Sequence, residues 1–324
     1  MKKINVGIIG SGFIVPVFLN TAGMFEEFHI RGLWGRHEEK IRAFANDADY
    51  CTTDLDRLLN DKEIDVIYVA LPNKLHYEYA MIALKHGKNV ILEKPFTVRY
   101  VQAKRLFAYA DEHDLILYEA ITTIHSPNYL KAKEYVKQLG EIRMVECNFS
   151  QYSRRYARFK EGIIAPAFDK NMAGGALMDL NVYNIHFVTG IFGRPKKAAY
   201  FPNVERDVDT SGVLVLDYGT FKASLIAGKD CRADCYGIIQ GDEGYLRCNT
   251  TCSRCAGFTL KKNDGSTEEI VDEDSEFTGW KHEMREVIRL YREHDTAKLK
   301  EYSDQTLNAV WVLEKAVKSA GLGY

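Results

Sequence analysis

Residues 4–15, INVGIIGSGFIV, join a short apolar run to a glycine-containing turn and a second apolar stretch. The run INVGII (4–9) predicts a β-strand that is buried on both faces, as in a parallel sheet. Gly10 would permit a tight turn after this strand, and Gly12 would let a ligand approach the backbone. A glycine turn that leads from a strand into a helix is typical of dinucleotide-binding domains, because the helix N-terminus favours the pyrophosphate anion.

Strand and helix patterns alternate through the first third of the chain. The expected strands are residues 4–9, 28–34, 64–71, 89–94 and 115–120, and the expected helices are 13–25, 37–47, 56–61, 76–88 and 101–114. This alternation predicts a doubly wound parallel sheet with helices on its faces, the Rossmann type of α/β fold. We place this dinucleotide-binding domain at residues 1–122.

The pattern changes in the second half, where most segments have the alternation of half-buried strands. The expected strands are residues 141–154, 196–202, 209–219, 220–228, 233–248 and 257–263, and the expected helices are 128–140, 176–193, 281–294 and 303–321. They predict an α+β domain, residues 123–324, whose sheet is largely antiparallel and open, with one face buried. We expect this domain to bind the substrate and to carry the oligomer interface.

The overall composition narrows the possible partners. The chain has 324 residues with 43 Lys and Arg against 45 Asp and Glu, which predicts no basic face for nucleic acid. No apolar run approaches the roughly 18 residues of a membrane span, and Gly10, Gly12 and Pro16 weaken any similarity of the N-terminus to a secretory signal. Seven cysteines, an odd number, favour a reducing compartment. We therefore expect a cytoplasmic protein with no membrane or nucleic-acid partner.

The end of the second expected strand bears on which dinucleotide binds. An acidic residue here would accept a hydrogen bond from the ribose 2′-hydroxyl of NAD, but residues 33–37, LWGRH, contain none before Glu38. Arg36 could instead pair with the 2′-phosphate of NADP or stack on the adenine, and His37 could assist. NADP is therefore favoured, and NAD stays open as the alternative, as does an Arg36 that is merely solvated.

A carboxylate, an ammonium and a proline end the strand in residues 89–97, NVILEKPFT. Open parallel sheets bind ligands at the carboxyl ends of their strands, so Lys94 is placed where a nicotinamide would lie. Its ammonium could donate a hydrogen bond or a proton to a substrate oxygen. Pro95 makes the preceding peptide bond a candidate for the cis form. The alternative is an ordinary surface lysine beside a strand-end glutamate.

A second set of polar side chains lies in the segment AGGALMDLNVYNIH, residues 173–186. Asp179, Tyr183 and His186 stand at i, i+4 and i+7, which predicts one face of a helix. A carboxylate, a phenol and an imidazole on an otherwise apolar helix suggest a binding site. The alternative is a polar stripe that neighbouring backbone groups satisfy.

Three clustered cysteines, Cys248, Cys252 and Cys255, have the C-x-x-x-C-x-x-C spacing of some iron–sulfur sites. The motif falls among expected antiparallel strands, and no second C-x-x-C pair stands at zinc-ribbon spacing. Free cysteines also serve as small apolar residues in sheets. We expect no metal site.

Three stretches together resemble the glucose–fructose oxidoreductase/inositol dehydrogenase (Gfo/Idh/MocA) family of NAD(P)-dependent oxidoreductases. They are residues 7–14 (GIIGSGFI), 69–95 (VALPNKLHYEYAMIALKHGKNVILEKP) and 174–186 (GGALMDLNVYNIH), and the likeness extends over essentially the whole chain. The E-K-P element combined with the later G-G-x-x-x-D helix is more specific than the glycine turn. The stretch LYEAITTIHSP (117–127) also resembles the dimeric dihydrodiol dehydrogenase branch.

The resemblance implies roles for individual residues. Lys94, Asp179 and Tyr183 match the family's active site; inositol dehydrogenases have a histidine at the position of Tyr183, which argues against that activity itself. We expect Tyr183 to exchange the proton, Lys94 to stabilise its phenolate and Asp179 to accept a substrate hydroxyl, because an unperturbed phenol, with a pKa of about 10, is a poor base. His186 is expected to be structural. The cofactor-binding residues implied by the glycine turn, the Arg36 loop and the resemblance are Gly10, Gly12, Phe13, Ile14, Arg36, His37, Leu71, Pro72, Asn73, His76, Glu93 and Lys94.

These assignments imply an oxidoreductase that transfers a hydride between nicotinamide and a hydroxyl or carbonyl carbon of a sugar, cyclitol or related diol. The alternative is a non-catalytic NAD(P)-binding sensor with the same fold. Substrate-contacting side chains of the second domain, with Tyr152, Arg155 and Arg158 as candidates, would set the specificity. The resemblance also implies a homodimer or homotetramer formed through the C-terminal sheet, whose outer face would need covering.

Overall fold

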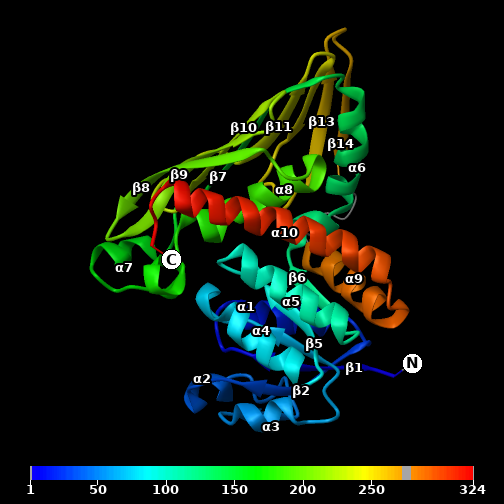
Figure 1. The fold of residues 1–324 in the computed structure, drawn as a ribbon, viewed down its shortest axis with the longest axis vertical. Helices are drawn as coiled ribbons and strands as arrows, with labels where there is room; N and C mark the ends of the chain where they lie inside the picture. Colours follow the sequence, from blue (N-terminus) through cyan, green and yellow to red (C-terminus); the bar gives the residue numbers. More distant parts are fainter. Residues whose placement is uncertain (1, 272–278, 324) are drawn as a thin grey trace. The chain divides into compact units, whose positions relative to one another are not determined.

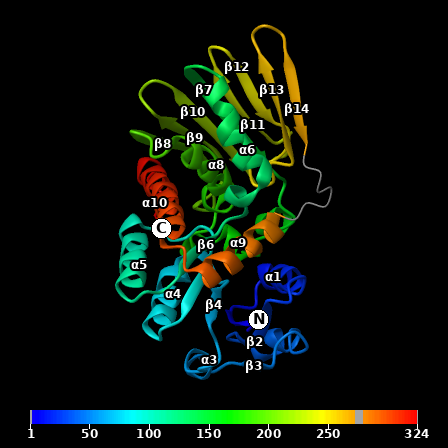
Figure 2. The same ribbon diagram turned by 90° about the vertical axis from the view of Figure 1, so that its right-hand side faces the viewer.

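The computed structural model describes residues 2–271 and 279–323, which form two compact units (Figures 1 and 2). Unit 1 comprises the chain up to Ala120 together with Glu283–Asp304, and unit 2 comprises Ile121–His282 and the chain from Gln305 onward. The domain division expected from the sequence stays a prediction. The segment Glu283–Asp304, which that division assigned to the second domain, packs with the first unit.

Unit 1 contains one parallel sheet of six strands. In spatial order they are β3 (Tyr50–Thr52), β2 (Phe28–Trp34), β1 (Ile4–Ile9), β4 (Val66–Val69), β5 (Asn89–Glu93) and β6 (Leu117–Ala120). All neighbouring pairs are parallel. This order reverses direction between β1 and β4, the place where doubly wound sheets bind ligands, so the expected Rossmann fold is confirmed.

Helices cover both faces of this sheet because its strands are apolar on both sides. They are α1 (Ile14–Ala22), α2 (Glu38–Arg42), α3 (Leu55–Leu59), α4 (His76–Lys85), α5 (Tyr100–Glu112) and α9 (Gly279–Glu293). Helix α1 and the part of α9 from Glu283 onward share one hydrophobic core, in which Phe18 stacks on Tyr68 of β4 with ring centroids 3.9 Å apart. Helices α4 and α5 pack together beside β5 and β6.

Unit 2 contains an eight-stranded sheet that is antiparallel except for the pair β7–β10. Its spatial order is β14 (Thr267–Val271), β13 (Gly257–Lys262), β12 (Gly244–Cys248), β11 (Tyr236–Gly241), β7 (Ile142–Ser150), β10 (Lys222–Gly228), β9 (Val208–Asp217) and β8 (Lys197–Glu205). The largely antiparallel α+β architecture expected from the sequence is confirmed. Strands β3 and β14 were not expected, because one is very short and the other is an exposed edge.

Helices α6 (Pro127–Tyr135), α8 (Val182–Phe192) and the part of α10 (Thr296–Ser319) from Gln305 onward lie against one face of the sheet in unit 2 (Figure 1). The short helix α7 (Tyr156–Lys160) lies near the end of β8, where the Tyr156 hydroxyl donates to Glu205 at 2.8 Å. The alternation along β12 is typical: Leu246 and Cys248 are buried, whereas Tyr245 and Arg247 are exposed. Among the described residues, no helix combines the length and the hydropathy that crossing a membrane requires.

Candidate functional site

The glycine turn after β1 has the shape that a dinucleotide requires. Gly10 has a φ of +134°, and a Cβ at this position would clash with the carbonyl oxygen of Ala70. A Cβ at Gly12 would meet no atom of the described chain within 4 Å, and Phe13 beside it is 76% exposed. Val15, where dinucleotide-binding turns usually have a third glycine or an alanine, is fully buried. The backbone at Gly12 is therefore open to a ligand, as a bound pyrophosphate would need.

Helix α1 starts directly behind this turn. Within the described chain, no side chain caps its N-terminus and its first turn contains no acidic residue. Ile14, the first residue of the helix, is half-buried. An uncapped helix N-terminus offers N–H donors and a partial positive charge to an anion. The residues present thus fit the phosphate groups of NAD or NADP.

The loop after β2 carries Arg36 and His37, and both side chains are exposed. A Cβ at Gly35 would lie 3.4 Å from the Ser11 hydroxyl, so this loop adjoins the glycine turn. The nearby carboxylate of Glu38 already accepts a hydrogen bond from Arg42 at 2.8 Å. The geometry is compatible with a guanidinium that reaches a 2′-phosphate.

Three buried side chains hold the backbone of residues 94–96. Glu93 accepts a hydrogen bond from the Lys94 backbone N–H at 3.1 Å, and Glu119 accepts one from the Phe96 N–H at 2.9 Å. His76 lies 2.8 Å from the Pro95 carbonyl oxygen through Nδ1. The peptide bond before Pro95 is cis, as the sequence had suggested. The strand-end carboxylate is therefore turned back into the protein, where it shapes the loop that presents Lys94.

Burial governs the protonation of two of these groups. It raises the pKa of Glu93 to about 7, against the opposing effects of a 2.6 Å hydrogen bond from Tyr68 and the Lys94 ammonium. Burial also lowers the pKa of His76, although its two carbonyl partners favour the charged form. The second carbonyl belongs to Leu71 and lies 2.8 Å from Nε2.

These contacts refine the expected cofactor loop. Both ring nitrogens of His76 lie within hydrogen-bond distance of backbone carbonyl oxygens, so the ring links the loops after β4 and β5. Leu71, Pro72 and Asn73, which precede α4, are half-buried. His76 would therefore affect a bound cofactor indirectly, by fixing the positions of these two loops.

In unit 2, the segment that carries the second polar set begins as a π-helix, Leu177–Asn181, and continues as α8. The Asp179 side chain is 34% exposed and accepts a hydrogen bond from the Lys229 ammonium at 2.8 Å. Tyr183 is half-buried, with its ring 5.9 Å from that of Phe149. His186 is fully buried.

The three side chains, which were predicted to share one helix face, differ in their exposure. Asp179 and Tyr183 reach the surface, but His186 points into the core, as its expected structural role requires. The π-turn has more residues per turn than an α-helix, so the i, i+7 relation of an ideal helix does not hold across it.

Buried polar groups anchor this helix. Asp209 accepts hydrogen bonds from the Leu177 backbone N–H at 2.7 Å and from the Tyr200 hydroxyl at 2.8 Å. The amides of Asn181 and Asn184 donate to backbone carbonyls of β10 at 3.1 and 3.0 Å. Sequence reasoning missed Asp209 and Lys229, for which no local motif exists. The Asn-x-x-Asn spacing was a visible signal that went unused.

The clustered cysteines do not form a metal site in the described residues. Cys248, Cys252 and Cys255 are buried and form no disulfide, and the part of the chain that the structure describes has no group of three or more His, Cys, Asp or Glu side chains placed to hold a metal ion. A hydrogen bond with Cys255 lowers the pKa of Cys248, whereas burial raises that of Cys252. They behave as core residues of the sheet.

Comparison with known proteins agrees with this geometry. Residues 4–121 match the model of an oxidoreductase family with an NAD-binding Rossmann fold, and residues 129–247 match the GFO/IDH/MocA C-terminal domain. The chain is 30% identical to scyllo-inositol 2-dehydrogenase (NADP(+)) IolU of Bacillus subtilis, over 99% of this chain and 98% of that protein. It is 27% identical to trans-1,2-dihydrobenzene-1,2-diol dehydrogenase of Xenopus tropicalis, over 69% and 66% of the two chains.

A solved structure shares the whole fold. KijD10, a 3-ketoreductase from Actinomadura kijaniata crystallised with NADP and TDP-benzene, superposes with a TM-score of 0.85 at 23% identity, over 98% of both chains. The resemblance found in the sequence is thereby confirmed. The chain belongs to the GFO/IDH/MocA family and is an NAD(P)-dependent oxidoreductase.

Proposed function

We propose that this oxidoreductase transfers a hydride between NADP and a hydroxyl or carbonyl carbon of a sugar, cyclitol or related diol. The observation that carries the proposal is the pair Asp179 and Tyr183, which reach the surface from a helix that is otherwise largely buried. A carboxylate held as an anion can accept a hydrogen bond from a substrate hydroxyl, and a phenol one turn away can exchange a proton. Relatives named for scyllo-inositol, D-xylose and a dihydrodiol support this substrate class.

The residues divide the chemistry as follows. The bound nicotinamide would supply or accept the hydride. Tyr183 would take the hydroxyl proton during oxidation and return it during reduction, a transfer worth roughly 10²–10⁴ in rate. Lys94, on the loop that Glu93, Glu119 and His76 fix, would stabilise the phenolate through its positive charge.

Replacing Tyr183 tests the assignment. We expect Tyr183→Phe to lower kcat by about 10²–10⁴ while NADP affinity is unchanged, because the ring stays and only the hydroxyl is lost. Steady-state kinetics on the best substrate of a panel containing scyllo-inositol, D-xylose and a trans-diol would measure this, with Tyr109→Phe, on helix α5 of unit 1, as the control. A wild-type rate in Tyr183→Phe would refute the proton-transfer role.

We also propose NADP rather than NAD as the cofactor. The support is the exposed Arg36 beside the glycine turn, the engagement of Glu38 by Arg42, and a relative named for NADP(+). Calorimetric titration should give at least tenfold tighter binding of NADP than of NAD, and Arg36→Ala should remove that preference without weakening NAD. Equal affinities in the wild type would contradict the proposal.

For the assembly, we propose a homodimer or homotetramer formed through the outer face of the sheet in unit 2. Met144, Phe201 and Tyr245 project from that face and are exposed to 47, 64 and 37%. Exposed apolar side chains on one face of a sheet are typical of an interface between chains. Light scattering should show an oligomer, and Phe201→Arg should shift it to smaller species. We further propose that the protein is cytoplasmic and binds neither nucleic acid nor membranes, as its seven cysteines, none of them in a disulfide, and its balanced charge suggest.

A further inference from the structure

Unit 2 contains a buried cation, Lys229, in the turn that follows β10. Its side chain is only 3% exposed, and its ammonium donates to Asp179 Oδ2 at 2.8 Å and to the Ala167 carbonyl oxygen at 2.5 Å. The same nitrogen lies 4.2 Å from the centre of the Phe168 ring, a cation–π contact. Two oxygens and one ring face therefore surround the ammonium.

The surroundings fix the position of this ammonium closely. The Lys229 backbone N–H donates to the Thr210 carbonyl oxygen at 2.7 Å. Phe168 is fully buried and stacks on Phe159, with ring centroids 4.9 Å apart. The neighbouring Asp230 accepts hydrogen bonds from the hydroxyls of Thr210 and Ser211, at 2.7 and 3.0 Å, and so has its own partners. The charge of Lys229 is thus directed at one carboxylate, that of Asp179.

Stability alone is a weak reason to bury such a pair. Removing an ammonium from water costs several kcal/mol, and well-packed apolar residues in place of a buried ion pair are often as stable or more so. Asp179 differs from its partner because about a third of its side chain stays exposed. The carboxylate therefore connects the buried lysine to solvent.

We propose that Lys229 is a positioning residue that holds Asp179 as an oriented anion, so that the site selects substrates presenting a hydroxyl donor to this carboxylate. The proposal rests on the function proposed above and adds a specificity determinant to it. A carboxylate that is fixed and kept charged rejects an analogue lacking the hydroxyl, because its oxygen then loses both water and its partner. The favoured class is a polyol, and the disfavoured class is the corresponding deoxy compound.

The test compares Lys229→Met, Lys229→Gln and Lys229→Arg in the NADP-bound enzyme. The probes are the best substrate of the panel above and its monodeoxy analogues. We expect Met and Gln to raise KM for the polyol at least tenfold, with a smaller change in kcat, and to reduce its discrimination from the deoxy analogue that the wild type rejects most strongly. Arg, which keeps the charge, should restore KM to within a few-fold of the wild type. If Met fails to fold, Gln and Arg still decide the outcome.

Lys222→Met is the matched control. Lys222 begins the same strand, is half-exposed and pairs with Asp217 at 2.9 Å, so its loss should change neither constant. A further arm measures polyol binding by calorimetry in Asp179→Asn and in Asp179→Asn/Lys229→Met. If Lys229 acts through Asp179, the second substitution should change the dissociation constant less than twofold.

The possible failures are distinguishable. A wild-type KM in both Lys229→Met and Lys229→Gln would overturn the proposal, as would an effect of Lys229→Met that persists in full without Asp179. In those cases a damaging Asp179→Asn would leave the proposed function standing. If Asp179→Asn itself leaves polyol binding and kcat unchanged, the role of Asp179 in the proposed function is wrong, and the role of Lys229 is wrong with it.

Discussion

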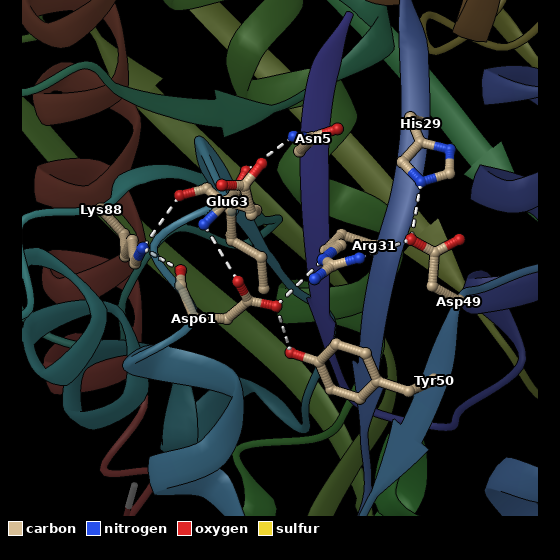
Figure 3. Close-up of polar contacts among 9 residues, drawn as sticks. Asn5, His29, Arg31, Asp49, Tyr50, Asp61, Glu63 and Lys88 are labelled. Atoms are coloured by element: carbon tan, nitrogen blue, oxygen red, sulfur yellow. Dashed lines mark hydrogen bonds and ion pairs between the residues drawn. The ribbon is translucent and has the colours of Figure 1, made fainter.

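In the parallel sheet of unit 1, the edge where the strands begin and the edge where they end differ in how their charged side chains are paired. Where the strands begin, Arg31 donates to Asp49 at 2.9 Å and to Asp61 at 3.1 Å, and the Tyr50 hydroxyl donates to Asp61 at 3.0 Å (Figure 3). Lys88 donates to two backbone carbonyl oxygens, at 2.6 and 2.9 Å. Each of these charges has partners of the opposite sign or polarity.

Three buried carboxylates lie near the edge where the strands end. Glu93, Glu119 and Glu283 are exposed to 5, 3 and 0%. Burial raises the pKa of Glu283 well above its ordinary value, and the neighbouring charges of Glu93 and Glu119 raise it further. An arrangement this unfavourable for anions contributes little stability, but it shapes and surrounds the loop that presents Lys94. Perturbed carboxylates of this kind are typical of functional sites. The contrast supports the proposal that one edge stabilises the fold and the other serves the chemistry.

The largest test of this contrast concerns the glycine turn at the functional edge. Gly10→Ala should lower the free energy of unfolding by about 2–4 kcal/mol and abolish NADP binding, because the new Cβ meets the Ala70 carbonyl oxygen at a positive φ. Gly12→Ala should weaken NADP at least tenfold but change stability by less than about 1 kcal/mol, because its Cβ meets no described atom within 4 Å.

Chemical denaturation and calorimetric titration would measure the two effects separately. Gly87→Ala offers a control for backbone strain, since Gly87 also has a positive φ, +71°, but its Cβ would be in open space. It should cost stability and leave NADP affinity unchanged. If Gly12→Ala binds NADP as tightly as the wild type does, the cofactor does not approach this turn, and the functional edge has been misassigned.

The contrast also explains what the sequence could predict about the fold. Strands β1 and β2 were predicted to the residue, because each is a short run of mainly apolar residues, and β1 is almost entirely buried. Strand β3 has three residues, and β14, TEEIV, is mostly exposed at the sheet's edge, so neither shows a clear hydrophobic pattern. The π-helix at Leu177–Asn181 has only five residues, too few for its period to be distinguished in the sequence from that of the α-helix it joins.

The candidate site was predictable only where a local motif exists. Gly10 and Lys94 stand in short motifs with a mechanical reason for each residue type. Glu119, Asp209 and Lys229 act on backbone or side chains 23, 32 and 50 residues away, so their partners are set by the tertiary fold. No spacing rule along the chain could have found them.

A smaller expected effect is that substitutions at the two edges change the pH dependence of stability in opposite directions. The folded-state pKa of Glu283 is raised, so the protein loses stability as pH rises above the ordinary value of 4.5, by up to about 1.4 kcal/mol per pH unit until the folded pKa is reached. Glu283→Gln removes this loss. The variant should therefore gain thermal stability over the wild type between pH 6 and pH 9.

Asp61 at the opposite edge should show the reverse sign. Burial would raise its pKa, but the Glu63 backbone N–H, the Tyr50 hydroxyl and Arg31 together lower it. A lowered pKa contributes stability above the ordinary value of 3.8 and loses it as pH falls. Asp61→Asn should therefore destabilise the protein at pH 6 and pH 9 by a similar amount, of about 1 kcal/mol, and much less near pH 3. Melting temperatures across this range would give both difference curves. Parallel curves for the two variants would mean that the carboxylates at both edges are held in the same way, and the division between a stabilising edge and a functional edge would fail.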